Sequence, residues 1–200
     1  MLYLSEMKRL LIYLFLGLFL TTPSQADDIR DFEIEGMNVG DSLLDYYSKR
    51  EIENGTTTFY PKSKDFFTLS ILNSKSDTYD QFSFHLKKDD KNYIIYSISG
   101  DFHFENDIKG CNIKKKKIID ELNSVFENLE QKNYDYKYLG FEDGKSVAAI
   151  TDFIFDDRSA VRVYCIDWSK VTEKNTDFVD MLSVDISPRS VLVWLEEEAY

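Results

Sequence analysis

The strongest constraint on the fold is an alternation of apolar and polar residues that recurs in both halves of the chain. In the first half, apolar side chains occupy every second position in Phe67–Ile71 and Phe82–Leu86, and Tyr93–Phe104 is a longer apolar-rich segment. A period of two is typical of a β-strand that buries one face. The polar run at 87–92 predicts a hairpin turn, and Gly100 predicts a bulge or kink. These segments predict a three-stranded meander.

The second half predicts a helix followed by three more strands. Residues 114–130 have apolar side chains at helical spacing, which indicates an amphipathic helix. The apolar positions are Ile118, Ile119, Leu122, Val125, Phe126 and Leu129. After a polar loop, strands are predicted at 147–155, 160–168 and 181–186.

Helices are predicted at two further places. The pattern from Asp41 to Asn54 is helical, with Asp41 as the N-cap and Gly55 as the residue that ends the helix. Near the C-terminus, Ser187-Pro188 is typical of a helix start, because Ser caps well and Pro suits the first helical position. The apolar face of this helix would consist of Val191, Trp194 and Leu195. An edge strand over SVLVWL is the alternative.

A short motif precedes two of the predicted helices. Ile34–Val39 (IEGMNV) aligns with Ile108–Ile113 (IKGCNI). We interpret each copy as a helix entry, in which apolar residues tie the helix to the sheet and the glycine permits a dihedral or approach that a side chain forbids. The sequence therefore predicts an α+β fold with an internal repeat of two αβββ-like units, at 27–105 and 106–200, plus a C-terminal helix. The two units would form one compact domain.

The N-terminus has the pattern of a secretory signal peptide over residues 1–26. Lys8 and Arg9 precede the apolar run Leu10–Leu20, and Ser24-Gln25-Ala26 forms a small-x-small cleavage site. The apolar run is shorter than the roughly 20 residues that a bilayer-spanning helix needs, although an uncleaved anchor is an alternative. We expect a periplasmic or secreted protein with no stable membrane insertion after cleavage.

Two cysteines, Cys111 and Cys165, are expected to form a disulfide bond. An isolated pair in a chain that is exported to an oxidising compartment predicts such a bond. The bond would join the second helix entry to the middle strand of its sheet. A redox-active pair is the alternative, but it usually needs a close CxxC-type spacing, which these cysteines lack.

The acidic composition limits the partners of this chain. With 24 Lys and Arg against 36 Asp and Glu, the formal net charge is −12, so the chain repels phosphate backbones and nucleic acid is not an expected partner. The exception is the basic run Lys114–Lys117. This run indicates contact with an acidic partner, a lipid head group or the acidic remainder of the chain, or alternatively a solvated first helical turn.

The two histidines are the candidates for a metal site. On a strand, Asp101, His103 and Glu105 share one face, and His85 lies on the preceding strand. A cluster of this kind could bind a divalent cation. Because acidic residues are common throughout the chain, a solvated polar sheet face is the simpler interpretation, and we predict no cofactor.

The run DIRDFEIEGMNVGDSLLDYYS, with the preceding signal and the closing WLEEEAY, resembles a group of small exported proteins of AT-rich marine bacteria. These proteins carry the opening I-x-G-M-x-x-G-D-S-L-L-D-Y and have no assigned activity, so the resemblance implies compartment and length. The Gly-Met-x-x-Gly-x-Ser pattern is also similar to the helix entry of small outer-membrane assembly lipoproteins, which place two helices on a three-stranded sheet. β-lactamase-inhibitor proteins duplicate a related unit. The chain lacks the lipid-bearing Cys of those lipoproteins, which argues against an outer-membrane role.

The sequence contains no nucleophile elbow, phosphate-binding glycine loop, HExxH motif or EF-hand loop. The leading hypothesis is therefore a non-catalytic protein-interaction or binding module with an envelope protein as its partner. One alternative is a small carboxylate-dependent hydrolase, which two facing carboxylates in a pocket would favour. Another is a solute-binding accessory protein that stacks aromatic rings on a sugar or peptide, which Tyr and Trp rings in a cleft would favour. A flat apolar sheet face would favour the first hypothesis.

Overall fold

The computed structural model describes residues 28–73, 78–126, 128–138, 143–176 and 178–199. The predicted signal peptide lies outside these ranges. The framework is an antiparallel sheet of eight strands in the order β1-β2-β3-β4-β8-β7-β6-β5. The strands are β1 (Thr56–Phe59), β2 (Phe66–Leu72), β3 (Gln81–Lys87), β4 (Ile95–His103), β5 (Glu130–Lys137), β6 (Val147–Ile154), β7 (Ala160–Asp167) and β8 (Met181–Ser187). The helices are α2 (Lys49–Asn54), α3 (Ile108–Val125), α4 (Lys170–Asn175) and α5 (Arg189–Glu197).

The α+β class is confirmed, but the expected division into tandem units is not evident in the described residues. Each half contributes a meander of four strands rather than three, and the two meanders join where β4 pairs with β8. The strands that the prediction missed are β1 and β5. Both are edge strands whose residues are mostly exposed, so neither shows the alternation that identifies a half-buried strand.

The two copies of the short motif have different structures, so the prediction of two equivalent helix entries is wrong. Ile34 and Met37 form an antiparallel bridge around a turn in which Gly36 has φ +77°. The second copy lies within the first turns of α3, where the Asp107 carboxylate accepts a hydrogen bond from the Gly110 N–H. The glycines still have the predicted roles. Gly36 has the special dihedral, and a Cβ at Gly110 would lie 2.1 Å from an Asp107 oxygen.

The first predicted helix is much shorter than expected. The backbone N–H groups of Gly40 and Leu43 donate to carbonyls at the start of β4 and just before it, which ties this segment to the sheet. A short 3-10 turn, Leu43–Asp45, precedes α2. The N-cap of α2 is Ser48 in a capping box with Glu51, not Asp41, and Gly55 ends the helix as predicted. A second 3-10 turn, Ile29–Asp31, opens the described chain.

The boundaries of the two longer helices also differ from the prediction. α3 begins at Ile108 because Asp107 caps it, and it ends at Val125, where the chain turns toward β5. The last helix is confirmed, with Val191 and Trp194 buried, but its N-cap is Pro188 and the preceding serine belongs to β8. The six-residue helix α4 was not predicted. In the described ranges, no helix has both the length and the apolar character that crossing a bilayer requires.

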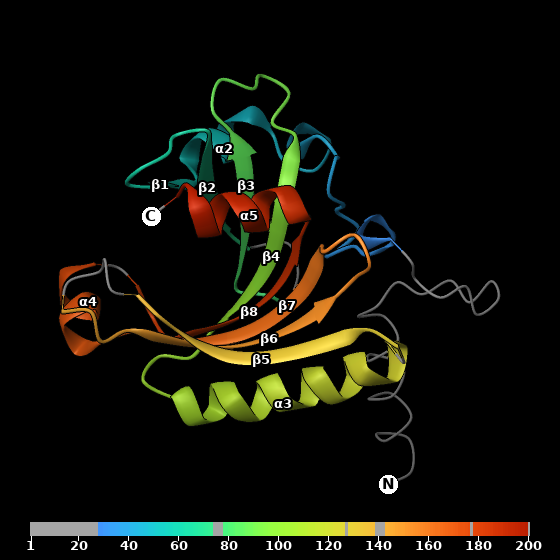
Figure 1. Cartoon of the computed structure of the whole chain (residues 1–200). Helices are drawn as coiled ribbons and strands as arrows, with labels where there is room; N and C mark the ends of the chain where they lie inside the picture. The colour runs from blue at the N-terminus through green and yellow to red at the C-terminus, as the bar shows by residue number, and fades with distance from the viewer. Residues whose placement is uncertain (1–27, 74–77, 127, 139–142, 177, 200) are drawn as a thin grey trace, which may run out of the picture.

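The sheet is strongly curved, and helices lie on both of its faces (Figure 1). α3 packs across β7 and β8 on one face, and apolar residues from 29–54 belong to the same core. The predicted Cys111–Cys165 disulfide is confirmed, and with Cα atoms 6.1 Å apart it fastens α3 to β7. α5 packs on the other face, where Trp194 contacts Tyr60 and Phe66.

Gly100 does not form the predicted bulge. It pairs regularly with Phe82 on β3 and with β8, and the irregularity lies instead between His85 and Leu86. The glycine is needed because the Tyr79 ring lies over it. A Cβ at this position would be 2.4 Å from the Tyr79 Cε1 atom, which is far inside van der Waals contact.

Candidate binding pocket beside helix α5

The sheet face that carries α5 is polar at its centre, where β4 and β8 meet. We call this region the polar seam, and it consists of Ser97, Ser99 and Asp101 on β4 with Ser183, Asp185 and Ser187 on β8. These residues alternate with the apolar residues that face α3, as the strand pattern predicts. The prediction of a solvated face is wrong for Asp101, because this residue and the other five of the seam are buried. A buried polar group is costly unless it is hydrogen-bonded, so their partners matter.

Asp101 has a full set of donors. Its carboxylate accepts hydrogen bonds from the hydroxyls of Ser83 at 2.7 Å and Ser183 at 2.6 Å, and from the Gln81 amide at 3.3 Å. Burial raises the pKa of Asp101, and these donors partly oppose the rise because they favour the ionised form.

Asp185 is held in a similar way. The Ser97 hydroxyl donates to one carboxylate oxygen at 3.0 Å, and the Ser187 hydroxyl donates to the other at 2.6 Å. Burial raises the pKa of Asp185 to about 6, against the opposing influence of the Arg162 guanidinium and the two hydroxyls. Arg162 itself is bound to Asp152, with 2.7 Å between Nε and Oδ1.

The two seam carboxylates bear on the hydrolase hypothesis. Asp101 pairs with Ser183 and Asp185 with Ser99, so the two aspartates are diagonal neighbours, with Cα atoms about 7–8 Å apart. Neighbours of this kind on one face of a sheet can act together as a carboxylate pair. However, both side chains are buried and saturated with serine donors, and neither lines the pocket beside α5 or the groove beside β1. These two aspartates therefore face no substrate space of the kind that the hydrolase hypothesis needs.

A second buried cluster surrounds His85. Its Nε2 is hydrogen-bonded to the Tyr60 hydroxyl at 2.6 Å, and that hydroxyl is also bonded to Thr68 at 2.8 Å. Burial lowers the pKa of His85 to about 4, so the ring is neutral at pH 7. The Trp194 indole packs edge-on against Tyr60, with centroids 4.8 Å apart.

The four metal-site candidates do not come together. His85 lies opposite Ser97 at one end of β4, whereas His103 ends that strand, so the two histidines are about 20 Å apart from the strand rise. Asp101 is bound by hydroxyls, and Glu105 is exposed beyond the strand. In the part of the chain that the structure describes, no three His, Cys, Asp or Glu side chains form a group that could hold a metal ion.

The basic run on α3 is not a continuous surface patch. Lys115 is buried and donates to the Ala149 carbonyl at 2.7 Å, while the Lys114 ammonium lies 3.4 Å from the centroid of the Phe102 ring. Lys116 forms an exposed ion pair with Asp120. The run also lies after the first turn of α3, so it is not a solvated first turn. Because Lys115 is buried, the four lysines do not form one docking patch either.

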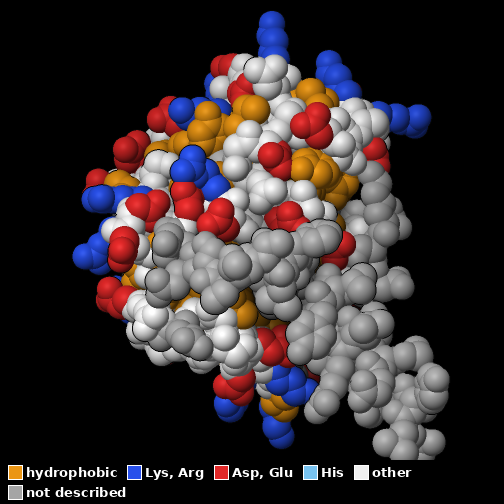
Figure 2. Space-filling model, turned by 90° about the vertical axis from the view of Figure 1, so that its right-hand side faces the viewer, with side chains coloured by type: hydrophobic (Ala, Val, Ile, Leu, Met, Phe, Trp, Pro, Cys, Tyr) orange, Lys and Arg blue, Asp and Glu red, His pale blue; other side chains and the backbone are white. Residues whose placement is uncertain are grey.

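Acidic groups are spread over the surface. Figure 2 shows Asp and Glu side chains interspersed with Lys and Arg on the face that it draws. On the visible atoms of this face, basic groups form no stripe of the kind that follows a phosphate backbone. The expectation that the partner is not nucleic acid stays a prediction.

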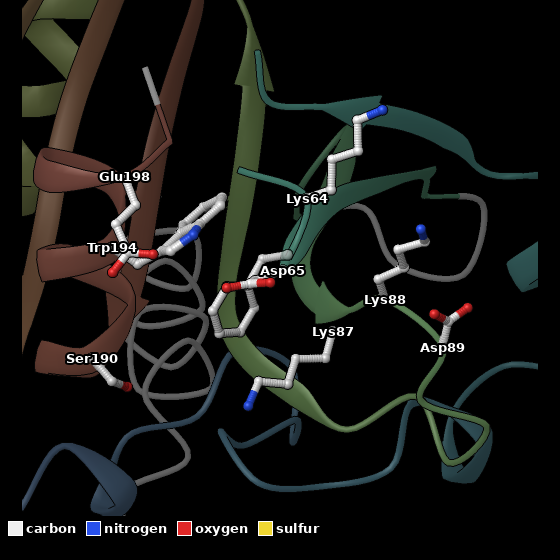
Figure 3. A pocket seen from close by; sticks show the side chains of 9 residues that line it. Lys64, Asp65, Lys87, Lys88, Asp89, Ser190, Trp194 and Glu198 are labelled. Atoms are coloured by element: carbon white, nitrogen blue, oxygen red, sulfur yellow. The ribbon is translucent and has the colours of Figure 1, made fainter. Parts of the chain in front are cut away.

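A pocket lies between α5 and the adjacent ends of β2 and β3. Its volume is about 630 Å³. One wall consists of Ser190, Trp194 and Glu198 at α5, and the other comes from the β2–β3 side (Figure 3). The second wall contains Lys64, Asp65, Phe66, Lys87, Lys88 and Asp89. The Lys88 N–H donates to the Asp65 carbonyl at 3.0 Å, which holds the two strand ends together.

Aromatic rings form the inner part of this pocket. The Trp194 and Phe66 rings meet edge-on with centroids 5.0 Å apart, and the Trp194 Nε1 donates to the Ser63 hydroxyl at 2.9 Å. The Lys87 ammonium lies over Phe66 and Tyr96, at 5.6 and 5.1 Å from the ring centroids. The rings therefore have fixed positions, which is what a recognition surface requires.

No family model, curated protein or solved structure matches the chain. The pocket itself therefore carries the functional argument. It holds three ammonium groups and three carboxylates, and within the described residues these six groups form no ion pair with one another. Figure 3 shows Lys64 and Lys88 extending away from Trp194. A pocket with unpaired charges of both signs around aromatic rings suits a ligand that carries both charges.

Sequence reasoning found one residue of this pocket. Trp194 was predicted to dock the last helix on the sheet, and it does. The charged residues come from 64–65, 87–89 and 198, and each set is unremarkable in a chain with this many charges. Only the antiparallel pairing of β2 with β3, and the position of α5 over them, places these residues around one space.

Proposed function

We propose that this protein is a non-catalytic binding module of an oxidising, extracytoplasmic compartment, and that it binds a small zwitterionic solute, such as an amino acid or short peptide, beside Trp194. The carrying observation is the pocket, with its aromatic inner wall and its six charges that are not paired with one another. This is the solute-binding hypothesis of the sequence analysis, which a cleft lined by aromatic rings was expected to favour.

The chemistry of the walls suggests how a ligand would lie. Its ammonium would contact the carboxylates of Asp65 and Glu198, and its carboxylate would reach Lys87. An apolar side chain would reach the edge of Trp194 that faces the pocket, since the rest of this ring is buried. Solvent-exposed ion pairs contribute roughly 1 kcal/mol or less each, so we expect weak binding, with a Kd of roughly 1 mM or higher.

The compartment rests on two observations. The disulfide between Cys111 and Cys165 is buried at the junction of α3 with the sheet, and such bonds persist in oxidising spaces. The N-terminal residues have the signal-peptide pattern. The resemblance to small exported proteins of AT-rich marine bacteria points the same way.

Intrinsic fluorescence tests the binding proposal, because the chain has two tryptophans. Titration with free amino acids and dipeptides should give a saturable change that persists in Trp168→Phe and is lost in Trp194→Phe. Trp168 belongs to a separate aromatic cluster, so its variant is the matched control. No saturable response to any zwitterion up to about 10 mM would refute the proposal.

Charge variants then test the assigned contacts. Glu198→Gln and Lys87→Gln should each weaken binding several-fold, because each removes one unpaired charge from a wall. Glu197→Gln is the control, since Glu197 is exposed on α5 but does not line the pocket. Equal affinities for all three variants would show that the ligand binds elsewhere.

A further inference from the structure

Among the residues that the structure describes, no strand pairs with the outer edge of β1. β1 pairs with β2 on one side and ends the sheet on the other (Figure 1). All four of its residues are exposed, and Phe59 keeps 59% of its surface accessible. An unpaired strand edge offers a row of N–H and C=O groups that another strand can bind.

The opposite edge of the sheet is protected and β1 is not. The edge strand β5 has the sequence EQKNYDYK, with alternating charges that discourage another strand from pairing. β1 has the sequence TTTF, without a charge or a proline. The contrast indicates that β1 is the edge available for association.

An apolar groove of about 260 Å³ lies beside this open edge. Thr57 and Phe59 point into it, because they pair with Leu69 and Phe67 on the same face of the sheet. The groove is completed by Ile52, Glu53, Lys88 and Tyr93. A strand added to β1 would therefore place every second side chain over an apolar surface.

Charges of opposite sign lie at the two ends of β1. Glu53 precedes the strand, and its ion pair with Lys49 is an exposed contact at 3.7 Å. Lys62 follows the strand and is exposed. Two copies of β1 that run antiparallel would place Glu53 of each copy near Lys62 of the other. The edge is thus complementary in charge to itself, despite the acidic chain as a whole.

We propose that β1 pairs antiparallel with β1 of a second copy of this chain, which extends the sheet across a two-fold axis. A two-fold axis perpendicular to the sheet keeps the groove faces of the two copies on one side. With Thr58 on the axis, Phe59 lies opposite Thr57 of the second copy, so each phenyl ring covers the groove of the other. Homodimers of this kind have self-complementary contacts.

The oligomeric state of the exported protein tests this proposal, by sedimentation at about 0.15 M salt to screen the net negative charges. We expect a reversible dimer at micromolar to millimolar concentration. Thr58→Lys should weaken it at least tenfold, because two ammonium groups would face each other on the axis. Gln131→Lys on the β5 edge is the matched control and should leave it intact. A monomer throughout, or a dimer that only the β5 variant disrupts, would overturn the proposal.

Two further pairs of variants test the register and distinguish a broken interface from misfolding. Thr58→Cys should form an intermolecular disulfide, since directly opposite residues have Cα atoms about 4.5–5.5 Å apart, whereas Thr57→Cys should not. Glu53→Lys should weaken the dimer about threefold, and Glu53→Lys with Lys62→Glu should restore it. Cross-linking at Thr57→Cys instead, or no rescue by the charge exchange, would refute this arrangement. The test is independent of ligand binding beside α5.

Discussion

Replacing the buried Asp185 with Asn should remove a pH-dependent loss of stability. Burial raises the pKa of this carboxyl from the ordinary 3.8 to about 6 in the folded protein. Between these values the folded state holds a proton that the unfolded state has released, so the free energy of unfolding falls as pH rises through this window. The difference between the two pKa values corresponds to about 3 kcal/mol of folding stability, and above pH 6 the folded protein has lost all of this stability. Below about pH 4 both states are protonated and nothing is lost.

Urea unfolding of the wild type and Asp185→Asn at several pH values between 4 and 7 measures this effect. An amide is nearly isosteric with a protonated carboxyl, and the Ser97 and Ser187 hydroxyls can rotate to suit it. We therefore expect similar stabilities near pH 4 and a relative gain for the variant of about 3 kcal/mol by pH 7. Asp156→Asn, in an exposed turn, is the control and should follow the wild type. If the free energies of unfolding of Asp185→Asn and wild type changed in parallel with pH, the burial argument would be refuted.

Three further changes have expected outcomes that calorimetry or denaturant unfolding can measure. Reduction of the Cys111–Cys165 bond, which spans 54 residues, should cost about 4 kcal/mol, and an unchanged midpoint under reductant would contradict the loop-entropy argument. Gly100→Ala should destabilise by about 1–3 kcal/mol because the new methyl group meets the Tyr79 ring, and a neutral effect would mean that the ring moves aside freely. Arg162→Met should cost about 3–5 kcal/mol because it leaves a buried carboxylate without its cation, and a stability gain would be the contrary result.

The strands that were predicted well are those that bury one face. β6, β7 and β8 match their predicted ranges within about a residue at each end, because apolar residues on their α3 side alternate with others on the opposite side. β1 and β5 escaped prediction because an exposed edge strand has no buried face to impose the pattern. The disulfide was predictable because the chain contains just two cysteines.

The segment before α2 shows where local sequence is not enough. Its residues Asp41–Tyr47 have apolar spacing that suits a helix, but Gly40 and Leu43 donate backbone hydrogen bonds to the carbonyls of Ile95 and Tyr93. Those bonds join residues about 50 positions apart in the chain, so no local sequence pattern predicts them. Tertiary hydrogen bonding overrides helix propensity here, which also explains why the two motif copies differ.

The candidate pocket lies on the sheet face that includes Asp101, for which the sequence predicted exposure to solvent. A polar seam offers a helix little of the apolar contact that normally holds a helix to a sheet. α5 is instead anchored at one side, where Trp194 meets Tyr60, Phe66 and the neutral ring of His85. These contacts fix the Trp194 indole beside the charged ends of β2 and β3. The space between α5 and those strand ends is the pocket. The serines and aspartates of the seam thus have a structural role, because their mutual hydrogen bonds allow a polar sheet face to be buried. The pocket proposed for ligand binding lies at the margin of that face.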